Sequence, residues 1–204
     1  MRLLGISGSP SHGSRTSRMI QQVLDAAAQQ ADVETELLEV VTSGAILCDG
    51  RPPEAYEGAT RQVIDKVVAA DAYVVGSPMY RGSYTGAFKN LFDLLPNDAL
   101  AGKVVGLVAT GGSDHHFLAL EHQLRPLLSF FRAHTVPGAV YAQNLHFVGD
   151  ELAEETLKAC HLLAEEVVRL SRALTPGQAG PAYPTIIRRS DQQPSSTSTR
   201  VGQT

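Results

Sequence analysis

The feature that most constrains the fold is a regular alternation of short apolar runs with longer segments of helical spacing. Apolar runs of five or so residues suit strands that are buried on both faces, and the segments between them repeat apolar residues as amphipathic helices do. This alternation is typical of a parallel sheet with helices on both faces. We therefore predict strands over residues 3–7, 36–41, 72–77, 104–109 and 139–141, and helices over residues 15–30, 59–70, 86–95, 116–133 and 151–173.

Five strands that alternate with five helices predict a flavodoxin-like α/β sandwich of three layers. Its five-stranded parallel sheet has the order 2-1-3-4-5, with helices on both faces. In such a sheet, ligands bind beyond the carboxyl ends of the strands, near the switch point between the first and third strands. The loops that follow Ser7, Ser77 and Ala109 meet at this edge and are the places to expect a site.

The chain of 204 residues is long enough for one sizeable domain and short for two. We expect that domain over residues 1–174, with a turn-rich surface loop at residues 42–58. Residues 175–204 are rich in Pro, Gly, Ser, Thr and Gln and cannot bury enough apolar surface to order themselves alone. They form either a free tail or an arm on a partner subunit, and "YPTIIRR" is their only apolar part.

Composition and charge exclude several classes of protein. With 43% hydrophobic residues, 19% charged residues and a net charge of -4, the chain lacks the basic character of a general nucleic-acid binder. The first residues do not form a signal peptide, and no 18-residue apolar stretch offers a membrane span, so we expect a cytoplasmic protein without a membrane partner. The two cysteines, Cys48 and Cys160, are too few for a disulfide framework and are expected to be reduced, buried thiols.

The first loop reads "GSPSHGSRTSR" and nearly has the spacing of a nucleoside-triphosphate loop. Gly8 and Gly13 fit, but Ser14 and Arg15 follow where such a loop needs Lys and then Ser or Thr. Several hydroxyls and one cation stand where a helix begins, and helix N-termini favour a phosphate group. A phosphate that is bound and not transferred fits this loop, and a hydroxyl-rich helix cap without a ligand fits it equally well.

The second and third loops add a second type of binding surface. The second reads "GSPMYRGSYTGAFKNLFDLLP", and it can present backbone N–H groups and aromatic side chains to a flat ring. The third reads "ATGGSDHH", and its glycine pair lets the backbone approach a ligand closely. A phosphate at one loop and a planar heterocycle between the other two describe a bound mononucleotide.

The three loops, in this order, resemble those of the NAD(P)H-dependent FMN reductases of the flavodoxin-like superfamily. The resemblance is greatest to the flavin reductases of two-component alkanesulfonate monooxygenase systems. It covers about residues 2–173 and rests on "GSP…SRTS", "PMYRGSYTGAFKNLFD" and "ATGGS". Phe88 and Thr85 depart from the residues usual in the family, but neither change removes a ligand group. The resemblance implies FMN and NADPH or NADH as cofactors, and a homodimer or homotetramer.

The resemblance also implies which residues bind the flavin. The phosphate would be held by Ser9, Ser14, Arg15 and Ser17. One side of the isoalloxazine ring would be bordered by Pro78, Met79, Tyr80, Arg81 and Gly82, and the other by Thr110, Gly111, Gly112 and Ser113. Lys89 and Asp93, at the start of the following helix, would have a structural or interfacial role.

His122 lies in a helix that resembles one with an inserted residue in the sulfonate-linked reductases. There the insertion forms a π-bulge at a subunit interface, and such bulges concentrate at functional sites. One hypothesis is that His122 faces the flavin site of a neighbouring subunit and influences whether FMN stays bound. The alternative is a solvent-facing or interfacial histidine in an unbroken helix.

Three other chemistries fit the motifs poorly. No histidine pair near Asp114, Glu121 and His122 has the i, i+4 spacing of a helical metal site, so we expect no metal. The "GISGS" stretch lacks the final Gly of a serine-hydrolase elbow. The dinucleotide fingerprint G-x-G-x-x-G is absent after the first strand, so the nicotinamide nucleotide would bind transiently on the flavin.

The predicted activity is hydride transfer from NAD(P)H to FMN, followed by delivery of reduced FMN to a partner monooxygenase. The cofactors carry this chemistry, so no catalytic side chain is required. Arg15 and Arg81 are candidates for contacting the phosphates of NADPH. One alternative is an enzyme that retains FMN and reduces a quinone, an azo dye or a metal ion. Another is a non-enzymatic electron carrier, although such carriers are typically more acidic than a net charge of -4.

Overall fold

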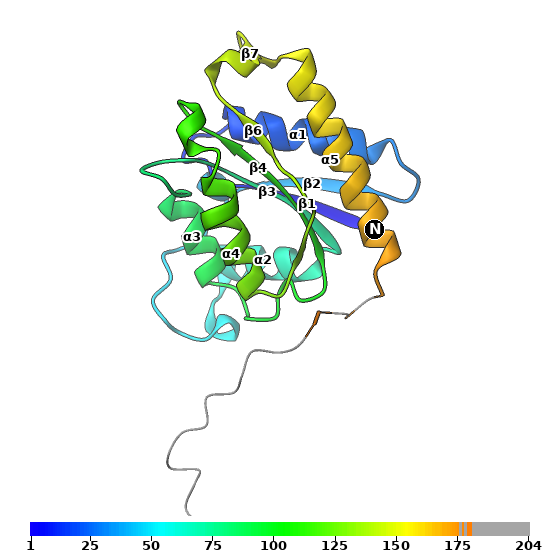
Figure 1. The fold of residues 1–204 in the computed structure, drawn as a ribbon. Helices are drawn as coiled ribbons and strands as arrows, with labels where there is room; N and C mark the ends of the chain where they lie inside the picture. The colour runs from blue at the N-terminus through cyan, green and yellow to red at the C-terminus, as the bar shows by residue number, and fades with distance from the viewer. Residues whose placement is uncertain (176, 178, 181–204) are drawn as a thin grey trace, which may run out of the picture.

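The computed structural model describes residues 1–175, 177, 179 and 180, and it has three layers, with a central sheet between two layers of helices (Figure 1). The strands of the sheet are parallel, in the order β2-β1-β3-β4-β5, where β5 is the short strand His134–Thr135. The four long strands are β1 (Arg2–Ser7), β2 (Glu34–Glu39), β3 (Ala72–Pro78) and β4 (Val104–Thr110). The predicted flavodoxin-like sheet is confirmed.

The fifth position of the sheet is filled by two short strands and not by one. Both β5 (His134–Thr135) and β6 (Val140–Ala142) pair in parallel with β4. The predicted strand over residues 139–141 corresponds to β6 alone. Pro137 has no N–H to donate to the ladder, and Gly138 has a φ of +78°, so the backbone leaves the sheet between the two strands.

Two groups of helices cover the two faces of the sheet (Figure 1). One face is covered by α1 (Arg15–Ala28) and α5 (Glu154–Ala173), and the other by α2 (Gly58–Ala69), α3 (Gly86–Asp93) and α4 (Arg125–Phe130). Alternate residues of each strand enter the two apolar cores. In β3, Tyr73 and Val75 pack toward α2 and α3, whereas Val74 packs toward α1 and α5.

Glycines in two strands allow the helices of one face to lie close to the sheet. A Cβ on Gly5 would stand 2.5 Å from Ile20 Cγ2 in α1, and a Cβ on Gly106 would stand 2.7 Å from Val167 Cγ2 in α5. Any larger residue would push α1 or α5 away from the sheet. These positions fix the distance between layers, and hence where α1 begins at the edge of the sheet.

The predicted helix over residues 116–133 is wrong as a single helix. A 3₁₀ turn, η3 (Asp114–His116), is followed by a π-helix, η4 (Leu120–Leu124), and then by α4. The N–H of Arg125 donates to the carbonyl of Leu120, five residues earlier. Pro126 follows directly and has no N–H for an α-helical bond to residue 122, so the ladder is interrupted at this point.

The last helix starts three residues later than predicted. Residues 151 and 152 form β8 (Glu151–Leu152), which pairs antiparallel with β7 (Phe147–Val148). This hairpin follows a 3₁₀ turn, η5 (Asn144–His146), and lies next to the first turn of α5 (Figure 1). Gly149, with a φ of +64°, turns the chain between the two strands.

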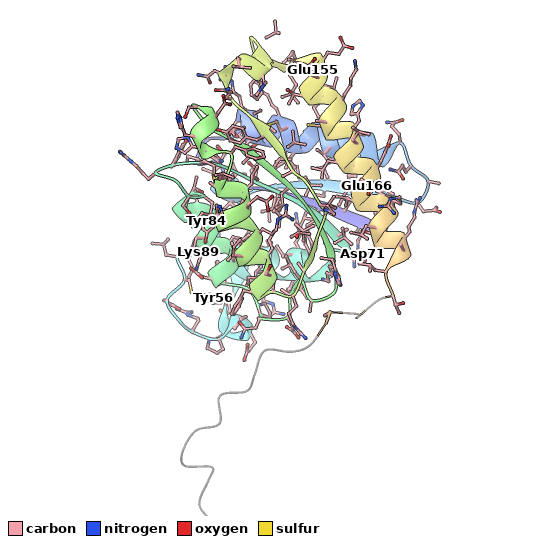
Figure 2. The ribbon with its side chains drawn as sticks, viewed as in Figure 1. Tyr56, Asp71, Tyr84, Lys89, Glu155 and Glu166 are labelled. Carbon is pink, nitrogen blue, oxygen red and sulfur yellow. The ribbon has the colours of Figure 1, made fainter. Side chains whose placement is uncertain are left out.

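The predicted loop at residues 42–58 starts at the end of one 3₁₀ turn, η1 (Val40–Thr42), and contains a second, η2 (Pro53–Ala55), before α2 begins at Gly58. Asn90 of α3 anchors this loop, because its side chain accepts from the N–H of Cys48 (2.8 Å) and donates to the carbonyl of Ile46 (3.0 Å). Tyr56 from the loop and Tyr84 and Lys89 near α3 lie on the same side of the molecule (Figure 2). Lys89 forms an ion pair with Asp93.

The prediction of two buried thiols is correct for one cysteine only. Cys160 is fully buried in α5, and burial raises the pKa of its thiol to about 12, whereas Cys48 is half-buried. Among the described residues, no helix combines the length and apolar character needed to cross a membrane. Most of the predicted tail lies outside the described residues.

Candidate functional site

The three loops singled out in the sequence meet at the carboxyl edge of the sheet and are tied to one another. The N–H of Gly8 donates to the carbonyl of Gly76 (2.8 Å), which joins the first loop to β3. The N–H of Met79 donates to the carbonyl of Thr110 (2.7 Å), and the hydroxyls of Thr16 and Thr110 share a buried hydrogen bond of 2.7 Å. The three loops therefore form one connected surface.

The first loop ends in a capped helix N-terminus. Ser14 is the N-cap of α1, and its Oγ accepts from the N–H of Ser17 at 3.1 Å. The N–H groups of Arg15 and Thr16 open the helix, where no preceding turn supplies a carbonyl for them. Ser9 and Ser17 are almost completely buried beside this terminus. Hydroxyls and free N–H groups at the positive end of a helix dipole are a donor set that fits a phosphate group.

A carboxylate from the neighbouring strand also reaches this loop. Glu39, the last residue of β2, accepts from the N–H of Gly13 (2.9 Å) and from the hydroxyl of Ser17 (2.5 Å), and its other oxygen contacts the ring of His12. Burial raises the pKa of Glu39, but the hydrogen bonds from Ser17, Gly13 and His12 outweigh that effect and hold the pKa below its ordinary value. Glu39 is therefore ionised at neutral pH.

Arg15 lies beside the phosphate loop but is directed away from its centre. Its guanidinium donates to Asn144 Oδ1 at 2.6 Å and stacks over the ring of Phe147 at 4.8 Å from the ring centroid. These contacts tie α1 to the segment that follows β6. A guanidinium has five N–H donors, so others remain for a second acceptor, and the contact of Arg15 with the flavin phosphate stays a prediction.

The second loop forms a tight turn at the edge of the sheet. Tyr80 and Ser83 exchange two backbone hydrogen bonds (2.8 and 3.1 Å), while Arg81 and Gly82 have φ values of +56° and +79°, as in a type I′ turn. Met79 is buried and offers only its backbone, whereas Tyr80 is 53% exposed. Pro78 is also buried, as the end of β3. The turn therefore presents one aromatic side chain and exposed backbone.

The third loop is held in place from β6. The N–H of Gly111 donates to the carbonyl of Ala142 (3.0 Å), and the hydroxyl of Tyr141 donates to the carbonyl of Ser113 (2.5 Å). A Cβ on Gly111 would collide with that Tyr141 hydroxyl, whereas a Cβ on Gly112 would meet open space. The hydroxyl of Thr110 is used by Thr16, so this loop offers mainly backbone to a ligand. Open backbone at two facing loops fits the planar ring of a flavin.

His122 lies within the π-helix, as the resemblance implied for this segment. Its N–H donates to the carbonyl of Leu118 (2.9 Å), and the next residue, Gln123, accepts a hydrogen bond of 3.3 Å from the hydroxyl of Ser83. The π-helix is thus connected to the turn at Tyr80–Ser83. The role of His122 toward the flavin of a neighbouring subunit stays a prediction.

Comparison with known proteins identifies the family. Residues 1–146 match the model of the family described as NADPH-dependent FMN reductase. The chain belongs to this family. The reductase is 44% identical over 180 residues to an NAD(P)H-dependent FAD/FMN reductase of Geobacillus thermodenitrificans, which covers 87% of this chain and 97% of the relative. It is 39% identical over 175 residues to the NADH-dependent FMN reductase SfnE of Pseudomonas putida, with coverage of 83% and 92%.

A solved structure gives the same result for the fold. The apo form of an NADH:FMN oxidoreductase (EMOB) superposes with a TM-score of 0.70 and 27% identity, over 86% of this chain and 90% of that one. As a member of its family the reductase is an oxidoreductase that uses NAD(P)H and FMN. The predicted family, enzyme class and cofactors are confirmed.

Sequence reasoning missed two contributors to the site. Glu39 accepts hydrogen bonds from the predicted phosphate loop, which includes Gly13, and Asn144 accepts a hydrogen bond from Arg15. The only signal for Glu39 was an acidic residue within the predicted second strand, since that strand was expected to continue to residue 41. The signal for Asn144 lay far along the chain, and only the folded structure brings it to α1.

Proposed function

We propose that this reductase binds FMN as an exchangeable substrate, reduces it with NADPH or NADH, and releases it to a partner flavin-dependent monooxygenase of the sulfonate type. The observation that supports FMN binding is that hydrogen-bond donors suited to a phosphate, at the N-terminus of α1, occur on the same connected surface as the open backbone at Gly82 and Gly112. The delivery role rests on the resemblance of the loops to the flavin reductases of two-component systems.

In this proposal each of the three loops binds a different part of FMN. Ser9, Ser14 and Ser17, with the N–H groups that open α1, bind the phosphate. The turn at Tyr80–Gly82 and the backbone of residues 110–113 border the ring. Bound FMN supplies the redox chemistry, because its ring accepts a hydride from the nicotinamide. The loops position the reactants, and Arg15 and Arg81 would contact the phosphates of NADPH.

We also propose that the reductase is a cytoplasmic homodimer or homotetramer. A groove between α3 and α4 is lined by Phe92, Leu95, Leu127 and Phe130, and Phe130 is 48% exposed. The exposed ring of Phe130 at this groove favours association with another subunit. Light scattering after size-exclusion chromatography would give the mass directly, and a monomer at micromolar concentration would contradict this part of the proposal.

The experiment that tests the activity is steady-state oxidation of NADPH and NADH, titrated with FMN, FAD and riboflavin, by the protein as purified and after removal of any bound flavin. We expect saturation by FMN and a much weaker response to riboflavin, because riboflavin lacks the phosphate. Activity that does not depend on added flavin, with FMN retained through purification, would favour the reductase of quinones, azo dyes or metal ions. Absence of oxidation with every flavin would favour the electron carrier.

A further inference from the structure

The carboxylate of Glu39 occupies donors of the loop that should hold the flavin phosphate. Glu39 pairs in register with Ser7 at the end of β1, so its side chain extends across the edge of the sheet into the loop before α1. Only 9% of the side chain is exposed. The proposed function requires an anion from outside at this place, and the protein already supplies one of its own.

The protons available in the loop cannot serve both anions at once. The hydroxyl of Ser17 has one proton, which it donates to Glu39 Oε1 at 2.5 Å, and Gly13 has one N–H, which it donates to the same oxygen at 2.9 Å. The hydroxyls of Ser7 and Ser14 lie 2.8 and 3.1 Å from the Ser17 oxygen and can donate to it. A phosphate that takes the proton of Ser17 must therefore take it from Glu39.

The charges conflict as well. A phosphate oxygen bonded to Ser17 would lie within about 6 Å of the Glu39 carboxylate, because each of two hydrogen bonds to one hydroxyl spans about 3 Å or less. A phosphate monoester carries close to two negative charges at neutral pH. The ring of His12 is in contact with Glu39, but its side chain is 77% exposed to solvent. Arg15 is directed at Asn144.

We propose that Glu39 is an internal anion that competes with the FMN phosphate for Gly13 and Ser17, and so lowers the affinity of the reductase for FMN. This inference rests on the proposed function, in which reduced FMN has to leave the enzyme. Glu39 holds the loop in its binding conformation while FMN is absent. It also keeps FMN binding weak enough for exchange.

The variant Glu39→Gln separates charge from shape. A glutamine can keep Oε1 as the acceptor for Gly13 and Ser17 and turn its amide toward His12, so the loop keeps its hydrogen bonds while the negative charge is lost. The matched control is Glu36→Gln. Glu36 lies on the same strand and pairs with Lys66, so this change alters net charge equally without touching the loop.

The measurement is the dissociation constant of FMN and of riboflavin for flavin-free protein, from quenching of flavin fluorescence. We expect Glu39→Gln to bind FMN at least about tenfold more tightly, since a like charge within about 6 Å shifts a neighbouring pKa by about one unit or more, which is the same factor. Riboflavin binding should be unchanged, and Glu36→Gln should match the wild type. Inorganic phosphate should also raise the melting temperature of Glu39→Gln more than that of the wild type.

Unchanged or weaker FMN binding by Glu39→Gln would overturn the inference, since Glu39 would then only support the loop. An equal gain for riboflavin would overturn it too, because the effect would not involve the phosphate. A wild type that binds FMN no better than riboflavin would overturn the proposed function together with this inference. If Glu39→Gln does not fold, Glu39→Asn, which also removes the charge, is measured with the same expectation.

Discussion

At the scale of single residues, the hydrogen bonds to Glu39 make the stability of the reductase depend on pH. Its pKa in the folded protein lies below the ordinary value of 4.5, because donation from Ser17, Gly13 and His12 outweighs the effect of burial. The folded state therefore binds fewer protons than the unfolded chain in this range. The contribution of Glu39 is fully present above about pH 4.5 and is lost as the pH falls through the lowered pKa.

We expect Glu39→Gln to lose less stability than the wild type between about pH 7 and pH 4, because it lacks a group that must be protonated. The free energy of unfolding by urea at the two pH values measures this. Glu36→Gln serves as the control, since the Glu36–Lys66 pair is exposed and worth little. An equal loss in Glu39→Gln and wild type would show that Glu39 does not contribute in this way.

The hydroxyl-rich start of α1 could be predicted from sequence, but the partner of those hydroxyls could not. The predicted second strand ran over residues 36–41, which placed Glu39 in the middle of the strand. In the structure β2 ends at Glu39, because Val40–Thr42 forms a 3₁₀ turn. A shift of two residues in a boundary therefore concealed a residue of the site.

At the scale of elements, the π-helix depends on one arginine. Arg125 caps this helix, and its guanidinium donates to both oxygens of Glu121 (2.6 and 2.7 Å), to the Thr135 hydroxyl (2.7 Å) and to the Val136 carbonyl (3.1 Å). The side chain is only 22% exposed. The guanidinium of Arg125 thus ties the π-helix to β5 and to the residue after it, and a separate bond between Gln123 and Ser83 ties the π-helix to the turn of the second loop.

We expect Arg125→Lys to destabilise the reductase by about 1–3 kcal/mol, because an ammonium group cannot reach all of these acceptors from one position. Urea unfolding gives the value. The matched control is Arg169→Lys, whose partner Glu166 is exposed on α5 (Figure 2), so its loss should stay below about 0.5 kcal/mol. Equal losses in the two variants would mean that the guanidinium network does not hold the π-helix.

Elements with long apolar periodicity were predicted correctly, whereas apolar spacing did not show where a helix or strand is interrupted. The first four strands and the helices α1, α2, α3 and α5 were found from spacing, with ends shifted by up to three residues. The division of the fifth strand was missed, although Pro137 was visible in the sequence, and the interruption of the fourth helix before Pro126 was indicated only by the resemblance that places a π-bulge at His122. Proline removes a donor, but only the surrounding packing decides whether the chain bends, bulges or ends there.

At the scale of the whole molecule, the sheet separates two apolar cores, one under α1 and α5 and the other under α2, α3 and α4. The core under α1 and α5 sets the distance of α1 from the sheet. It therefore also sets where the N-terminal donors of α1 lie relative to the second and third loops. The topology followed from the alternation of strands and helices alone. The exact separation of the layers did not follow from that alternation, because it depends on which positions of the strands are glycine.

The separation of the layers can be tested at Gly106. A Cβ there would stand 2.7 Å from Val167 Cγ2 and 3.3 Å from Leu163 Cδ1, so Gly106→Ala should destabilise the protein by about 1–3 kcal/mol through overpacking. Gly86→Ala is the matched control, because its Cβ would meet open space at the first position of α3, and it should be neutral or up to about 1 kcal/mol more stable.

The double variant Gly106→Ala with Val167→Ala makes this test specific, because shortening Val167 removes the atom with which the new Cβ collides. We expect the double variant to be less destabilised than the sum of the two single variants, with a coupling of about 0.5 kcal/mol or more in urea unfolding. Strict additivity would mean that α5 yields to the extra carbon without strain. The close approach of α5 to β4 would then not fix the spacing between the layers.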